Sequence, residues 1–314
     1  MSDQAGEHVL RNKGLAKVYI ALLLALGIAI GIAELYVVVQ VVLPGFTPLV
    51  SPTPEPSATP TPSAFPTTSP APTPAETPSS QPTPAPTWAP VVRRASNWAG
   101  YSVATSTDPH SAEPNVTMVS ASWTVPTVQR APQDQYSAVW IGIGGEFDST
   151  LIQCGTRQDS VGGQTTYQAW YELLPRNSIR IPQISVSPGD QMQATIKLAN
   201  AISDSWLLNI TDVTKGVSFQ NTFTYASSQL SAEWILERPN VNNVLSSLAN
   251  FDKVTFTNCT ATIGTQMGVI TSFPALQSVM YSQIATPESA QQLVDVSPVS
   301  ENGTEFSVIY RRTG

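Results

Sequence analysis

Histidine and cysteine are scarce in this chain, and their scarcity removes several kinds of catalytic site. Among 314 residues there are two histidines, His8 and His110, and two cysteines, Cys154 and Cys259. A serine triad needs a histidine beside its nucleophile, and a zinc site usually needs several His or Cys ligands. Because His8 precedes a long apolar run, only His110 could act as the histidine of such a site. We therefore expect any enzymatic chemistry to use carboxylates and amides, without a metal or other cofactor.

Charge is also sparse. Only 12% of the residues are charged, and the 15 Lys and Arg against 22 Asp and Glu give a net charge of -7. Without a basic patch to neutralise phosphates, nucleic acid is not an expected partner. The surface is instead expected to be rich in Ser, Thr, Asn and Gln, as in many exported β proteins.

A long stretch without basic residues follows the N-terminus. Residues 18–43 are almost wholly apolar, which is long enough for a helix that crosses a bilayer. Three basic residues precede this run, and the next one is Arg93. This asymmetry predicts a cytoplasmic tail over residues 1–17, a signal-anchor helix over 18–43 and an extracytoplasmic C-terminal part. The alternative is a signal peptide cleaved near Ala33, which would release a secreted protein.

Residues 44–91 are dominated by Pro, Thr, Ser and Ala, and 14 of the 27 prolines lie between Ser51 and Pro90. Proline fixes φ and removes a backbone donor, so this stretch is expected to form an extended, disordered stalk. It ends near Arg93-Arg94, which is either a processing site or, as we favour, a pair of ordinary surface arginines.

Residues 92–314 are predicted to form one all-β domain. Short alternating runs are separated by Gly, Pro, Asn and Asp, as in an antiparallel sandwich or barrel. The one plausible helix is short and covers about residues 241–248, after Pro239. Strands are expected at residues 116–125, 137–143, 165–173, 183–186, 191–198, 206–212, 218–225, 253–263 and 305–311.

Cys154 and Cys259 are expected to form a disulfide, because an exported domain meets an oxidising compartment. That bond requires Cα atoms within about 7 Å of each other. The alternative is two buried free thiols.

Several motifs follow one another in a characteristic order, and the chain resembles the glutamic peptidases (eqolisins, peptidase family G1) from about Ser96 to Thr262. The motifs are SNWAGY at 96–101, SWTVP at 122–126, WIGIGG at 140–145, LIQ at 151–153, YQAWYE at 167–172, PGD at 188–190, AEWI at 232–235 and TFTN at 255–258.

The resemblance implies a concanavalin-like jelly-roll β-sandwich and an endopeptidase that works at acid pH on proteins or peptides. The family's catalytic pair maps onto Gln153 and Glu233. Two positions depart from the family pattern, since Gly144-Gly145 and Gln168 stand where fungal members carry Asp. These departures bear on the pH optimum and the substrate pocket.

The chemistry of such a pair is physically reasonable. Peptide hydrolysis needs a base for the water, a donor for the oxyanion and an acid for the leaving amine. An ionised Glu233 can deprotonate water and later protonate the amine. Gln153 does not titrate, and its amide can donate to the oxyanion and orient the water.

Five further residues are candidates for substrate binding: Trp98, Trp140, Gly145, Trp170 and Glu172. Tryptophans in a sandwich are core residues at least as often as they line a cleft. Gly145 is expected in a turn beside the cleft, and Glu172 either tunes the site as a second carboxylate or has a structural role.

Two other functions remain open. Similar sandwiches bind sugars, so the domain could be a stalked carbohydrate-binding module without catalysis. A surface spacer or adhesin is the third hypothesis, and the presence of both Gln153 and Glu233 in matching contexts argues against it.

Overall fold

The computed structural model describes residues 88–282 and 289–314. The expected tail over 1–17, the signal-anchor over 18–43 and nearly all of the stalk over 44–91 lie outside the described residues. Among the residues that are described, no helix is long and apolar enough to cross a membrane.

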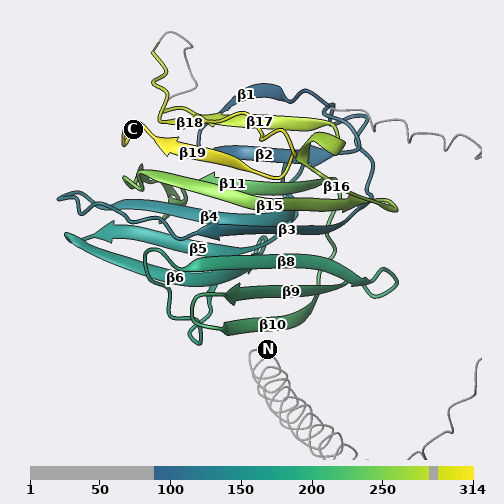
Figure 1. Ribbon diagram of the computed structural model, residues 1–314, viewed down its shortest axis with the longest axis horizontal. Helices are drawn as coiled ribbons and strands as arrows, with labels where there is room; N and C mark the ends of the chain where they lie inside the picture. The colour runs from purple at the N-terminus through teal and green to yellow at the C-terminus, as the bar shows by residue number, and fades with distance from the viewer. Residues whose placement is uncertain (1–87, 283–288) are drawn as a thin grey trace, which may run out of the picture. The chain divides into compact units, whose positions relative to one another are not determined.

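The described part of the chain is built from two large sheets that lie one behind the other in Figure 1. We call the nine-stranded sheet the cleft sheet and the eight-stranded sheet the back sheet. The cleft sheet has the order β1 (Val91–Ala95), β17 (Ala275–Met280), β2 (Trp98–Ala104), β11 (Ser231–Glu237), β4 (Gln135–Gly144), β5 (Leu151–Val161), β6 (Gln164–Leu173) and β7 (Ile179–Arg180), with β14 (Ser247–Leu248) beside β4. The back sheet has the order β10 (Val217–Thr224), β9 (Ser205–Asp212), β8 (Gln191–Asn200), β3 (Val116–Thr124), β15 (Lys253–Ile263), β19 (Phe306–Tyr310) and β18 (Val294–Val296), with β16 (Gln266–Val269) beside β15.

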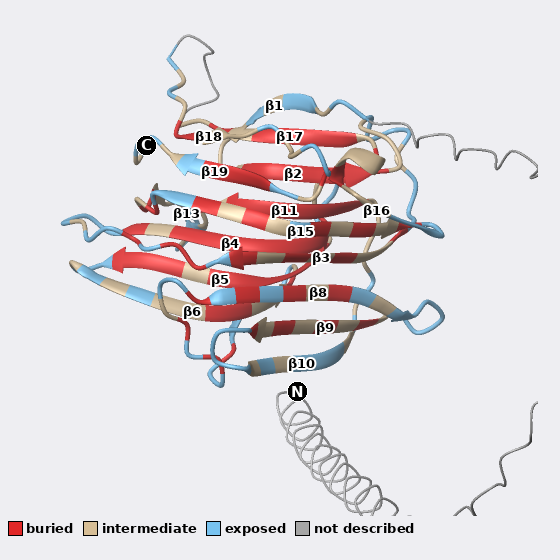
Figure 2. Cartoon of the chain, in the orientation of Figure 1, coloured by how far each residue is buried: buried red, intermediate tan, exposed pale blue. Residues whose placement is uncertain are grey.

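The core lies between the two sheets because each strand turns alternate residues inward. On β4, Val139, Ile141 and Ile143 belong to the core cluster, which also contains residues of the back sheet. The intervening residues Ala138 and Trp140 belong to a second cluster on the opposite face of the cleft sheet. Figure 2 shows β2, β11, β4 and β5 buried along most of their length. The cleft sheet is therefore covered on both faces.

The all-β sandwich predicted from the alternating runs is confirmed. Strand β15 has the expected bounds, and β3, β4, β6, β8, β9, β10 and β19 start or end within a few residues of theirs. The run expected at 183–186 is wrong, because this segment is a turn and irregular chain between β7 and β8.

The helix expected at residues 241–248 is wrong. A hairpin of β12 (Asn240–Val241) and β13 (Val244–Leu245) occupies this stretch, followed by β14. Asn242 and Asn243 have φ of 53° and 61°, the left-handed conformation that a tight two-residue hairpin turn requires. In the described parts of the chain the only helix is a short 3-10 turn, η1 (Ile270–Ser272).

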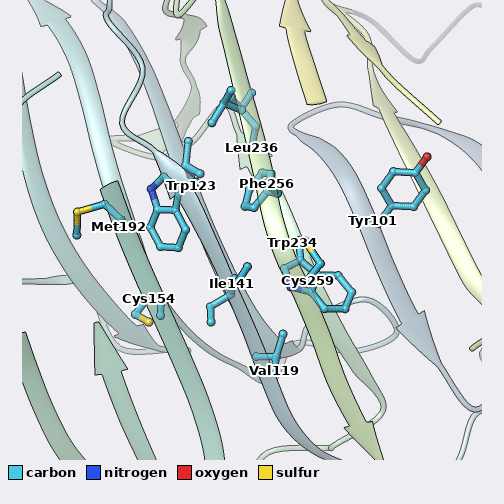
Figure 3. Packing of buried hydrophobic residues seen from close by; sticks show 14 of the residues in the cluster. Tyr101, Val119, Trp123, Ile141, Cys154, Met192, Trp234, Leu236, Phe256 and Cys259 are labelled. Atoms are coloured by element: carbon cyan, nitrogen blue, oxygen red, sulfur yellow. The ribbon is translucent and has the colours of Figure 1, made fainter. Parts of the chain in front are cut away.

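The expected disulfide is also wrong. Cys154 and Cys259 are both free and fully buried. Cys154 lies on β5 of the cleft sheet and Cys259 on β15 of the back sheet, and stacked sheets lie about 10 Å apart. Figure 3 shows the two side chains on separate strands, with Ile141 between them in this view. Burial raises the pKa of both thiols, so they behave as small apolar core residues.

Candidate active site

Gln153 and Glu233 lie in one row of paired residues that crosses five strands of the cleft sheet. In this row Ser102 on β2 pairs with Glu233 on β11, and Glu233 pairs with Gly142 on β4. Gly142 in turn pairs with Gln153 on β5, and Gln153 with Glu172 on β6. Directly paired residues on neighbouring strands point to the same face. The row therefore lies on the face of the cleft sheet that is turned away from the core.

Gly142 separates the two candidate catalytic residues and contributes no side chain. A Cβ atom at this position would lie 2.8 Å from Leu151 Cδ1 and 3.0 Å from a ring carbon of Trp140. Two strand spacings place the backbones of Glu233 and Gln153 about 10 Å apart. The glycine leaves the space above it to the side chains of Leu151 and Trp140.

Gln153 is held by Glu172. The Gln153 Nε2 donates a hydrogen bond to Glu172 Oε2 at 2.7 Å, while the Gln153 Oε1 has no partner among the described residues. Burial raises the pKa of Glu172, and hydrogen bonds from Gln153 and Ser178 oppose the rise. Because an ionised carboxylate only accepts hydrogen bonds, this contact fixes which end of the amide faces Glu172.

Glu233 is fully buried, and neither carboxylate oxygen has a hydrogen bond of regular geometry to the described residues. Burial raises the pKa of Glu233 well above 4.5, and the nearby Ser231 hydroxyl opposes the rise. Glu146 and Asp148 raise this pKa further, whereas Arg93 lowers it. A buried and unpaired carboxylate is an uncommon arrangement that is found at functional sites.

The Gly144-Gly145 turn brings Glu146 back over the sheet beside Glu233. Gly144 and Gly145 have φ of 88° and 95°, and a Cβ atom on Gly144 would lie 2.5 Å from the backbone oxygen of Thr150. A residue with a side chain at Gly144 would thus be strained. The turn carries Glu146 to within 2.7 Å of the Ser102 hydroxyl.

A cavity of about 510 Å³ lies over the same face of the cleft sheet. Four of the five candidates for substrate binding, Trp98, Gly145, Trp170 and Glu172, line it together with Gln153. The fifth, Trp140, is fully buried and packs edge-on against Trp98 at 5.1 Å between ring centroids. Trp140 therefore supports the wall of the cavity behind Trp98.

Sequence reasoning assigned no role to Glu237, which also lines the cavity. It accepts hydrogen bonds from Trp140 Nε1 at 2.8 Å and from Asn97 Nδ2 at 3.4 Å. Burial raises the pKa of Glu237 to about 7, the Trp140 hydrogen bond opposes the rise, and the charge of Glu172 adds to it. Glu237 follows Glu233 by four residues on one strand, so strand alternation alone places both on the same face.

Arg157 is a second residue of the cavity wall that sequence reasoning missed. It pairs across β5 and β6 with Gln168, the other departure from the family pattern. Its Nε lies 2.6 Å from the Asp159 carboxylate. The chain thus places a guanidinium directly across from Gln168.

The family model described as the Peptidase A4 family matches residues 96–307. This segment contains the row of paired residues and most of the cavity, so the match decides the family of the chain. The chain belongs to the Peptidase A4 family. The glutamic-peptidase resemblance of its motifs is thereby confirmed.

Two fungal relatives and one solved structure show the similarity in detail. The chain is 28% identical to aspergillopepsin-2 of Aspergillus niger over 54% of its own length and 65% of the relative's. It is 28% identical to scytalidopepsin B of Scytalidium lignicola over 68% of its own length and 78% of the relative's. A crystal structure of scytalido-glutamic peptidase with a transition-state analogue inhibitor covers 69% of this chain and 98% of its own, with a TM-score of 0.56 and 24% identity. At 24% identity, the similarity to this crystal structure supports the fold alone.

Proposed function

We propose that residues 92–314 form a glutamic endopeptidase in which Glu233 is the general acid and base and Gln153 stabilises the oxyanion. The observation that carries this proposal is the row Glu233–Gly142–Gln153 across three adjacent strands. It places a carboxylate and an amide on the same face of the sheet, next to a cavity that can hold a peptide.

In the first step, the ionised Glu233 takes a proton from water as the water oxygen attacks the peptide carbonyl carbon. The negative charge that develops on the carbonyl oxygen receives a hydrogen bond from Gln153 Nε2. An amide nitrogen carries two hydrogens, so Gln153 can donate one to Glu172 and one to the oxyanion. In the second step, Glu233 gives its proton to the amine nitrogen, the C–N bond breaks, and a carboxylic acid and an amine leave.

The cavity supports a peptide or protein substrate. Its wall combines the aromatic side chains Trp98 and Trp170 with the polar groups Asn97, Gln153 and Glu172. Pockets that mix apolar walls with a few convergent polar groups are typical binding sites.

The location of the domain is part of the proposal. The apolar run at 18–43 and the Pro-rich stretch at 44–91 support an extracytoplasmic peptidase domain on a membrane-anchored stalk. Fractionation of cells and N-terminal sequencing of the mature protein test this: an uncleaved N-terminus in the membrane fraction supports the anchor, and a secreted form that begins just after Ala33 contradicts it.

The peptidase proposal is tested by incubating the purified protein with a denatured protein substrate from pH 3 to pH 7, with and without an inhibitor of aspartic proteases. We expect cleavage that the inhibitor does not affect and that both Glu233→Gln and Gln153→Ala abolish. The matched control is Glu301→Gln, because Glu301 is exposed. Sugar binding without cleavage would contradict the proposal in favour of a stalked carbohydrate-binding module.

A further inference from the structure

An ion pair between Arg93 and Glu146 lies next to Glu233, and Arg93 is outside the segment that the family model matches. Arg93 lies on β1, before the matched segment begins at residue 96. Both terminal nitrogens of its guanidinium contact the Glu146 carboxylate, Nη2 at 2.8 Å from Oε2 and Nη1 beside Oε1. The Glu146 side chain is fully buried, which is unusual for a surface ion pair.

Two serines hold this ion pair in place. Ser102 donates to Glu146 Oε2 at 2.7 Å, and Arg93 Nε donates to Ser278 Oγ at 2.8 Å. Ser102 is the residue paired with Glu233 across β2 and β11. The Glu146 carboxylate therefore binds the hydroxyl that stands beside Glu233, and Arg93, which also lines the cavity, pairs with Glu146.

We propose that Arg93 and Glu146 form a compensating charge pair that sets the pH at which Glu233 takes up its proton. The inference deepens the proposed function and rests on it, because the charge of Glu233 matters for activity only if Glu233 is the base. Neither Arg93 nor Glu146 touches the reacting atoms in this account. Both are positioning residues that act through the charge of Glu233.

The two charges act on Glu233 with opposite signs. Burial raises the pKa of Glu146, and Arg93 and the Ser102 hydroxyl oppose the rise. When ionised, Glu146 disfavours a second negative charge beside it, and the positive Arg93 favours one. The other groups that influence Glu233 are Asp148, an exposed acid on the segment between β4 and β5, and the uncharged hydroxyl of Ser231. Gly142 and Gln153 on the neighbouring strands do not titrate. The net field at Glu233 thus depends mainly on whether Arg93 and Glu146 are both present.

This arrangement predicts a specific pattern in a double-mutant cycle. Glu146→Gln keeps the size of the side chain and removes its charge, which leaves Arg93 uncompensated. The acidic limb of the kcat/KM profile should then move to lower pH by about one unit. Adding Arg93→Gln to this variant should move the limb back towards its original position, whereas adding Arg93→Lys should keep it low because the positive charge remains.

A structural role would give a different pattern. If the ion pair only holds β1 against the sheet, the variants lower the melting temperature and the plateau of kcat/KM while the midpoint of the acidic limb stays fixed. A fixed midpoint in Glu146→Gln, or no reversal in the double variant, would overturn the inference. Glu301→Gln is the control for removing one acidic charge far from the site.

A second readout follows Glu233 without relying on catalysis. NMR titration of the protein labelled with ¹³C at the glutamate carboxyl carbons reports the protonation of Glu233, with its signal assigned from Glu233→Gln. We expect the midpoint to fall in Glu146→Gln and to rise again in the double variant. If the protein cleaves nothing yet the midpoints move as expected, only the proposed function fails. If cleavage depends on Glu233 and the midpoints do not move, only the charge pair fails.

Discussion

Glu233 and Gln153 lie in register on two strands of the same sheet, with Gly142 on β4 between them. Glu233 is fully buried, while Gln153 lines the cavity. Both side chains are thus shielded from solvent, and the amide borders the cavity in which a peptide would bind. Burial makes the Glu233 carboxylate a stronger base, and the position of Gln153 lets an oxyanion donor contact the substrate.

Gly142→Ala tests whether the close packing over Gly142 is needed. The new methyl group would collide with Leu151 and Trp140, so we expect kcat/KM to fall at least tenfold and the free energy of unfolding to fall by about 1–3 kcal/mol. Gly162→Ala is the control, because Gly162 has φ of 57° and open space around it. It should cost about 1 kcal/mol of stability and leave kcat/KM unchanged. Equal activity in both variants would show that this packing does not position the pair.

The pH profile tests the charge state of Glu233. Its pKa lies well above 4.5, and it acts as a base only when ionised. As pH falls through that pKa, Glu233 becomes protonated and kcat/KM should decline with the slope of one proton. The midpoint is expected above pH 4.5. A rate that stays constant down to pH 3 would contradict the assignment of Glu233 as the base.

Glu172 is predicted to orient the Gln153 amide. Glu172→Ala removes the acceptor of the 2.7 Å hydrogen bond and lets the amide rotate. We expect kcat to fall by about tenfold or more with a smaller change in KM, because an oxyanion donor acts mainly in the transition state. Glu172→Gln keeps an acceptor oxygen and should retain more of the rate. A loss that appears in KM alone would instead identify Glu172 as a substrate contact.

Stability is predicted to decrease as the pH rises towards neutral. Burial raises the pKa of Glu237 to about 7 and that of Asp159 to about 6, so the folded state holds these protons more tightly than the unfolded state does. Their contribution is fully present at acid pH and is lost as pH rises from the ordinary carboxyl range through 6 to 7. Glu237 alone accounts for on the order of 3 kcal/mol. Thermal unfolding between pH 4 and pH 8 measures this trend, and Glu237→Gln should flatten it; an unchanged slope in that variant would contradict the prediction.

The strands could be predicted from the sequence because alternation and turn residues are local signals. The structure of the stretch after Pro239 could not be predicted, because it depends on two asparagines, Asn242 and Asn243, that adopt the left-handed conformation. The prediction of a disulfide failed for a different reason. Composition suggested an oxidising compartment, but only the packing of the sheets shows that Cys154 and Cys259 lie on opposite sides of the core.

The candidate site could also be predicted only in part from local sequence signals. Motif resemblance identified Gln153, Glu233 and Glu172, and Glu237 was within reach of strand alternation. Arg93 and Glu146 are 53 residues apart, and no periodic pattern connects them. Their contact depends on the Gly144-Gly145 turn and on the pairing of β1 with β17, both of which are features of the folded chain.

The most direct test of this account is the kcat/KM of Glu233→Gln at the pH optimum, measured beside Glu301→Gln and with thermal unfolding to confirm that both variants fold. Removing a group that serves as both base and acid should lower kcat/KM by about 10⁴-fold or more. Glu301→Gln should match the unaltered protein. If folded Glu233→Gln keeps a tenth or more of the original activity, Glu233 is not the catalytic acid and base.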